Sequence, residues 1–116
     1  SIKTIVETPA DFVFMHGCGF SCFLIRDRCV DLVGSFDEGI SPGYAYYEDV
    51  DFALRMVKTP AVRRLRIEAG IIHEGSSTWR SGTSEQIKDH WDRFYRAKKN
   101  FEQKWGFAPE SLAGVV

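Results

Sequence analysis

The sequence has no long hydrophobic run, no strong excess of one charge and no paired cysteines. No segment approaches the roughly 18 uninterrupted apolar residues that a membrane span needs, so we expect no such span. A net charge of −1 provides no basic field to hold nucleic acid, and we expect no nucleic-acid partner. The odd set Cys18, Cys22 and Cys29 lacks the CxxC spacing of a zinc site, which predicts reduced, buried thiols.

The composition that remains is that of an ordinary globular chain. At 116 residues, with 44% hydrophobic and 27% charged residues, it favours one compact domain over residues 1–116. An acid at Glu7 comes too early for the apolar region of a signal peptide. We therefore expect a cytoplasmic protein, with the inner face of a membrane as the alternative location.

Short apolar runs predict the strands of a small mixed sheet. Residues 11–15 and 20–25 form two such runs, and the glycines between them predict a bend. Residues 62–67 alternate apolar and basic side chains in the manner of an edge strand. A further strand is expected over residues 69–72, ending at His73.

Helical spacing predicts a short helix over residues 29–34, a second over residues 48–57 and a long third. The third begins after a capping box of Thr83 and Gln86 and runs for about 22 residues before Gly106. Its expected inner stripe comprises Ile87, Trp91, Phe94, Phe101 and Trp105. The stripe should pack on the body of the domain, with a partner subunit in a homodimer as the alternative cover. The fold class is therefore α/β.

Chemistry-bearing residues gather around the start of the second helix. Glu48, Asp49 and Asp51 crowd its first turn, after a loop rich in glycine and tyrosine. Carboxylates there are more often caps than catalysts, and His73 taken singly is more often a structural histidine. Asp49-Val50-Asp51 also matches the DxD pattern of nucleotide-sugar metal sites.

Taken in order, these features resemble the C-terminal half of the family 2 glycosyltransferases, over roughly residues 10–106. The segments that carry the resemblance are Gly17-Cys18-Gly19, Phe23-Leu24-Ile25-Arg26, Val33-Gly34-Ser35-Phe36-Asp37-Glu38, Tyr44 to Tyr47, Glu48-Asp49-Val50-Asp51-Phe52-Ala53-Leu54-Arg55, His73-Glu74-Gly75-Ser76-Ser77 and Lys104-Trp105-Gly106. Ser35 stands where the family prefers glycine, and Lys58-Thr59-Pro60 replaces a usual glycine turn.

The resemblance implies roles for individual residues. Asp49 would be the catalytic base, and Glu48 would orient it or bind acceptor hydroxyls. His73 would ligate the Mn²⁺ or Mg²⁺ ion that holds the nucleotide diphosphate. Asp51 and Arg55 would be structural members of the helix, and the DxD reading of the triplet is disfavoured by its position.

Other residues are candidates for the acceptor side. The aromatic loop, Tyr47 included, offers platforms for sugar rings, and Trp79 could serve likewise or belong to the core or rim. His16 beside Gly17 either lines the acceptor cleft or is a structural histidine.

The implied fold is the C-terminal half of a GT-A nucleotide-diphospho-sugar transferase. The nucleotide-binding half with its metal-binding DxD is absent from these residues, so we expect it in the same or another chain. This part alone is then expected to be inactive as an enzyme.

The implied reaction transfers a sugar with inversion from a nucleotide-sugar donor to a glycan, lipid-linked or small-molecule acceptor, as in polysaccharide biosynthesis. Inversion requires a base that deprotonates the acceptor hydroxyl opposite the leaving group, and a divalent metal stabilises the departing diphosphate. One alternative is a non-catalytic module that binds carbohydrate or protein through Tyr44 to Tyr47. Another is a metal-dependent hydrolase using His16, Asp37, Asp49 and His73.

Overall fold

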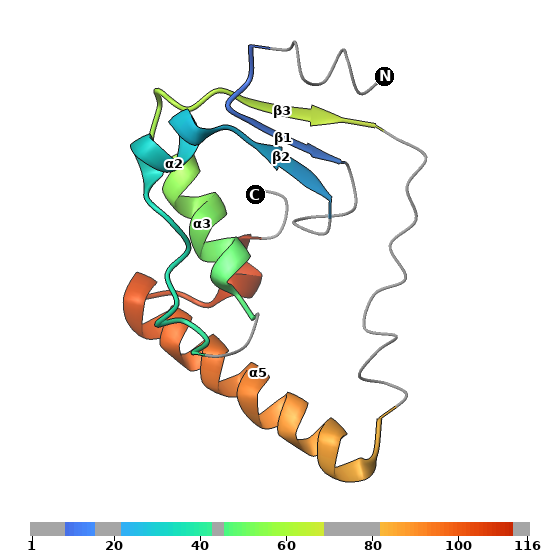
Figure 1. The fold of residues 1–116 in the computed structure, drawn as a ribbon. Coiled ribbons are helices and arrows are strands. Elements are labelled where there is room, and N and C mark those ends of the chain that lie inside the picture. Colours follow the sequence, from blue (N-terminus) through green and yellow to red (C-terminus); the bar gives the residue numbers. More distant parts are fainter. Residues whose placement is uncertain (1–8, 16–21, 43–45, 69–81, 113–116) are drawn as a thin grey trace. The chain divides into compact units, whose positions relative to one another are not determined.

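The computed structural model describes residues 9–15, 22–42, 46–68 and 82–112 (Figure 1). Within this part of the chain it has three α-helices, one short 3₁₀ helix and a mixed sheet of three strands. The described residues divide into two compact units. The strand unit comprises residues 9–15, 22–35 and 55–68, and the helix unit comprises residues 36–42, 46–54 and 82–112.

The sheet of the strand unit has the order β2-β1-β3. β1 (Phe12–Met15) pairs antiparallel with β2 (Phe23–Ile25) and parallel with β3 (Arg64–Ile67), as Figure 1 shows. β1 lies in the centre and Val13 is fully buried, which explains its uninterrupted apolar sequence. β3 alternates exposed arginines with half-buried apolar residues, as predicted for an edge strand. β2 begins three residues later than the apolar run that predicted it, and β3 begins two residues later than its run. The strand expected over residues 69–72 lies outside the described residues.

α2 (Asp27–Val33) begins two residues before the predicted helix and ends at Gly34 as predicted. Gly34 adopts φ 91° and its N–H donates to the Val30 carbonyl at 2.7 Å, a positive φ that favours glycine. Arg55 donates to the carbonyls of Val33 at 3.1 Å and Ser35 at 2.7 Å, and so holds the exit from α2. A structural role for Arg55 agrees with these contacts.

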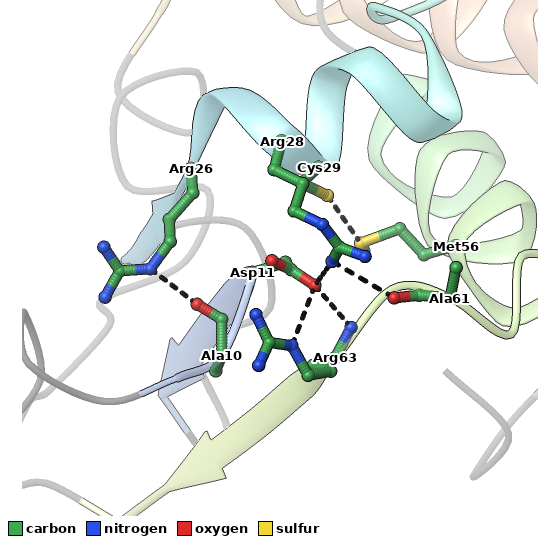
Figure 2. A network of polar contacts seen from close by, with 8 residues as sticks. All are labelled: Ala10, Asp11, Arg26, Arg28, Cys29, Met56, Ala61 and Arg63. Atoms are coloured by element: carbon green, nitrogen blue, oxygen red, sulfur yellow. Dashed lines mark hydrogen bonds and ion pairs between the residues drawn. The ribbon is translucent and has the colours of Figure 1, made fainter.

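A polar network in the strand unit surrounds Asp11, whose side chain is buried (Figure 2). Its Oδ2 accepts the backbone N–H of Arg63 at 2.8 Å and the guanidinium of Arg28. The Arg63 N–H is the main cause that lowers the pKa of Asp11 to about 2, and the guanidinium groups add to it against the opposing effect of burial.

The thiols are partly as predicted. Cys29 is buried in the strand unit, and its Sγ donates to the Met56 Sδ at 3.8 Å. Burial, followed by the charge of Asp11, raises the pKa of Cys29. Cys22 is only half-buried, so the prediction of a buried thiol is wrong there because Cys22 precedes the short strand β2 rather than lying within it. Cys18 lies outside the described residues.

α3 (Glu48–Val57) has the predicted bounds. α5 (Ser84–Trp105) has the predicted capping box of Thr83 and Gln86 and ends at Gly106, which has φ 81°. Among the described residues, no helix is long and apolar enough to cross a membrane.

The inner face of α5 differs from the predicted stripe. Its buried residues are His90, Ala97 and Phe101, whereas Trp91 is 39% exposed. The prediction of two tryptophans on the inner face is therefore wrong for Trp91. Residues 90, 97 and 101 lie on the same face of a helix with 3.6 residues per turn. Residue 91 lies about 100° further around the helix axis and so points away from that face.

The core of the helix unit centres on Ile40, Leu54 and Phe101. Half-buried side chains that pack on this core are Tyr47, Val50, Trp105 and Phe107. Phe52 is also fully buried and stacks on Phe36 at 4.7 Å between ring centroids. The core thus joins α5 to the first turns of α3 and to the chain before it.

Candidate functional site

The candidate site is the start of α3, where the predicted base stands. Tyr47, the residue before the helix, has φ 62°, an unfavourable conformation for a bulky side chain. Its carbonyl accepts the N–H of Asp51 at 3.0 Å, and its ring lies 5.2 Å from that of Phe94. Packing on α5 thus holds a strained residue that turns the chain into α3.

The Tyr47 hydroxyl group is affected by the same surroundings. Burial raises the pKa of Tyr47, and the charge of Glu110 adds to the rise. The ring contacts with Phe94 and Phe101 belong to the core of the helix unit. Tyr47 therefore supports the start of α3 through contacts within the helix unit, and its role as a platform for sugar stays a prediction.

Glu48 carries the most unusual polar atom of the site. Its Oε2 is buried, and no described residue donates a hydrogen bond to it. Burial raises the pKa of Glu48, which its own backbone N–H partly opposes and the neighbouring charge of Asp49 reinforces. A buried carboxylate oxygen without a donor is costly, and a water, an ion or a ligand can supply the missing partner.

Asp49 stands in the first turn of α3 and is half-buried. Its Oδ1 accepts the N–H of Val50 at 2.8 Å, and no described residue donates to its Oδ2. One oxygen is thus fixed to the helix, and within the described part of the chain the other has no donor that would compete with an acceptor hydroxyl. This is the arrangement that a general base requires.

Asp51, two residues on, is in a different environment. It is fully buried, and its Oδ1 accepts the indole N–H of Trp105 at 2.9 Å. The same oxygen lies 2.7 Å from the Nζ of Lys104. These contacts agree with the structural role that the sequence implied for Asp51, and they make it unsuitable as the second ligand of a DxD metal site.

Lys104 links this buried carboxylate to a second one. Its Nζ also lies 2.8 Å from the Oδ2 of Asp37. Burial alone would lower the pKa of Lys104, but the hydrogen bonds to Asp37 and Asp51 outweigh it, so the pKa is raised. Asp37, a member of the hydrolase alternative, is therefore tied to a lysine in the helix unit.

The pair of Tyr46 and His90 was missed by the sequence reasoning. The Tyr46 hydroxyl is hydrogen-bonded to the Nδ1 of His90, whose ring lies 6.2 Å from that of Phe94. In the sequence, the one signal for this pair is that residue 90 falls on the same helical face as the buried residues 97 and 101. Both Tyr46 and Tyr47 are half-buried and have ring contacts within the unit.

The remaining predicted site residues, His16, Gly17, His73 and Trp79, lie outside the described residues. Within the described part of the chain, no three His, Cys, Asp or Glu side chains are grouped closely enough to hold a metal ion. The described residues alone therefore do not form the Mn²⁺ or Mg²⁺ site that the resemblance implies.

Comparison of the chain with models of protein families, with curated proteins and with solved structures found no match in any of the three.

Proposed function

We propose that this chain is the acceptor-binding, base-carrying half of an inverting nucleotide-sugar glycosyltransferase of the GT-A type, with Asp49 as the general base. The expected donor half lies in the same or another chain. In this proposal His73 would ligate the divalent metal ion that holds the nucleotide diphosphate.

The observation that carries the proposal is the contrast between Asp49 and Asp51. The carboxylate of Asp51 is buried and occupied by Lys104 and Trp105. That of Asp49 has an oxygen to which no described residue donates. The resemblance assigns the base to the first of these aspartates and a structural role to the second, and the two environments support that division.

In the proposed reaction, Asp49 accepts the proton of an acceptor hydroxyl. The acceptor oxygen then forms a bond to the anomeric carbon as the bond from that carbon to the nucleoside diphosphate breaks on the opposite face. The proton ends on Asp49, the diphosphate leaves with the bonding electrons, and the configuration is inverted. Glu48, whose raised pKa increases its protonated fraction, can hydrogen-bond a second acceptor hydroxyl beside the base.

The test is Asp49→Asn in the full-length protein, assayed for sugar transfer with a panel of nucleotide sugars and Mn²⁺. Loss of a general base should lower kcat by about 10²- to 10⁴-fold. Far-UV circular dichroism and the thermal midpoint check that folding is unchanged. Retained turnover in a folded variant would overturn the assignment.

Asp27→Asn is the matched control. Asp27 is an exposed aspartate in the first turn of α2, so it shares with Asp49 the favourable interaction with a helix N-terminus. If Asp49 acted only through the helix dipole, both substitutions would have similarly small effects. Under the proposal, Asp27→Asn leaves kcat within about twofold, because a first-turn charge changes little beyond local stability.

Titration with nucleotide sugars and Mn²⁺ separates the enzyme from the binding-module alternative. A glycosyltransferase should bind the donor and release the nucleoside diphosphate in the presence of an acceptor. A module that holds carbohydrate or protein should ignore both reagents, and that result would refute the proposed reaction.

A further inference from the structure

A small pocket in the helix unit lies between α5 and the segment of residues 40–42. Its volume is about 130 Å³. The residues that line it are Ile40, Ser41, Pro42, Arg93, Arg96, Ala97 and Asn100. The four from α5 are spaced three, one and three residues apart, so they share one side of the helix.

The wall opposite α5 is held in place. Asn100 donates its side-chain N–H to the Ile40 carbonyl at 3.0 Å, and Ile40 is itself in the core of the helix unit. Ser41, the next residue, is also buried. The pocket therefore has a fixed shape formed by two segments about 60 residues apart in the sequence.

The pocket is cationic. Arg93 and Arg96 both line it, and none of its described lining residues is acidic. Arg93 is partly neutralised, because its Nε lies 2.8 Å from Asp89. Arg96 has no ion pair with any described residue, and Ser41 adds a hydroxyl group that can donate.

The surrounding helix strengthens this local charge. From Arg93 to Trp105, α5 has one acid, Glu102, against the cations Arg93, Arg96, Lys98, Lys99 and Lys104. Lys98 and Lys104 are paired with acids of the helix unit. Arg93 is paired with Asp89, so Arg96 lining the pocket and Lys99 outside it are the cations of this stretch without an ion pair to a described residue.

From these features we infer that the pocket binds a phosphoryl group of a ligand, with Arg96 as the main contact. The lining residues Arg93, Arg96, Ser41 and Asn100 carry hydrogen-bond donors, and guanidinium geometry matches the oxygens of phosphate. A space of about 130 Å³ accommodates one phosphate group and its first attached atoms. The inference rests on the pocket and stands apart from the role of Asp49.

The phosphoryl group could belong to a free metabolite or to a lipid headgroup. Both sources present the same oxygens to Arg96, and the test must separate them. A soluble phosphate ester needs only the pocket, whereas a headgroup also brings a membrane surface to α5.

The test is titration of the folded full-length protein with inorganic phosphate, followed by NMR of the amides of residues 40–42 and 93–100. Acetate at equal ionic strength controls for any anion. Arg96→Gln should weaken phosphate binding about tenfold, as expected for the loss of a charge-assisted hydrogen bond. Shifts that acetate reproduces, or no saturable shift at all, would overturn the inference.

Lys99→Gln is the matched control, because it removes the same charge from an exposed position on α5 outside the pocket. It should change phosphate affinity by less than about twofold, since a remote exposed charge acts only through screened attraction. Equal weakening by both substitutions would mean diffuse attraction and no site. Arg96→Lys, which keeps the charge without the planar fork, should give an intermediate affinity.

Sedimentation with phosphatidylcholine vesicles, with and without phosphatidic acid, distinguishes the two sources. Co-sedimentation that requires phosphatidic acid and is lost in Arg96→Gln assigns a lipid headgroup. Phosphate binding without co-sedimentation assigns a soluble ester. Neither result depends on Asp49, so failure of the proposed reaction and failure of this pocket are observed separately.

Discussion

Asp11 in the strand unit and Asp51 in the helix unit are both buried, yet each is surrounded by donors. Asp11 receives a backbone N–H and two arginines, and Asp51 receives an indole N–H and a lysine. Glu48 and Asp49, three and two residues before Asp51, have oxygens to which no described residue donates.

The difference separates carboxylates that are held by donors within their unit from carboxylates with an oxygen to which no described residue donates. A buried charge remains in a protein when partners compensate for its lost hydration. Where the partners are missing, the cost is tolerated only if something else is gained, and binding or proton transfer are the usual gains. Among the described residues, Glu48 has the buried oxygen without a donor, whereas Asp49 is half-buried.

The largest expected effect on stability comes from substituting Asp51, the buried carboxylate that is held by donors. Asp51→Asn should destabilise the helix unit by about 2 kcal/mol, because it removes the buried negative charge that lies 2.7 Å from the Nζ of Lys104. Asp49→Asn should cost less than about 1 kcal/mol, the value of a first-turn charge. Urea unfolding of both variants at neutral pH measures the difference. Equal losses would place Asp49 among the structural carboxylates.

The next test measures how the contribution of Asp11 to the stability of the strand unit depends on pH. Because the pKa of Asp11 falls from 3.8 to about 2 on folding, its contribution to stability is complete above pH 3.8 and is lost as the pH falls toward 2. Asp11→Asn should lower stability at neutral pH and remove this part of the acid dependence. Unfolding curves between these pH values measure it.

The exposed Asp31 on α2 provides the control for this test. Asp31→Asn should leave the acid profile of the wild-type protein in place. If Asp11→Asn retained the same profile, the stabilising effect would belong to other carboxylates.

Most of the regular structure was predictable because its signals are local. The bounds of α3, the capping box at Thr83 and the glycines after α2 and α5 follow from spacing and from caps within a few residues. Strand starts were placed too early, since apolar side chains continue beyond the ladder hydrogen bonds that define a strand.

The site was less predictable, because it depends on contacts between distant residues. Nothing near Asp51 in the sequence shows that Trp105 and Lys104 surround it, although both lie in a segment that carries the family resemblance. The exposure of Trp91 depended on the phase of α5 against a core that only the fold defines. The pocket at Arg96 likewise joins two segments that no motif connects.

The smallest expected effect has the opposite sign. Burial raises the pKa of Glu48, so the folded state prefers its protonated form and the charged form opposes folding at neutral pH. The dipole of α3 favours the charge at this position, and the direction of the pKa shift indicates that burial wins. Glu48→Gln should therefore stabilise the protein by roughly 0.5 kcal/mol at neutral pH, a gain typical of relieving a functional compromise.

The stabilisation by Glu48→Gln should appear only above the ordinary glutamate pKa of 4.5. Below the ordinary glutamate pKa of 4.5, Glu48 is protonated in both states and the variant loses its advantage. The advantage should grow as the pH rises from 4.5 through the raised pKa of the folded protein, and thermal midpoints across this range measure it. Destabilisation by Glu48→Gln at neutral pH, where the side chain is charged, would mean that the helix dipole outweighs burial. Glu48 would then belong with Asp11 and Asp51 as a carboxylate that holds the fold.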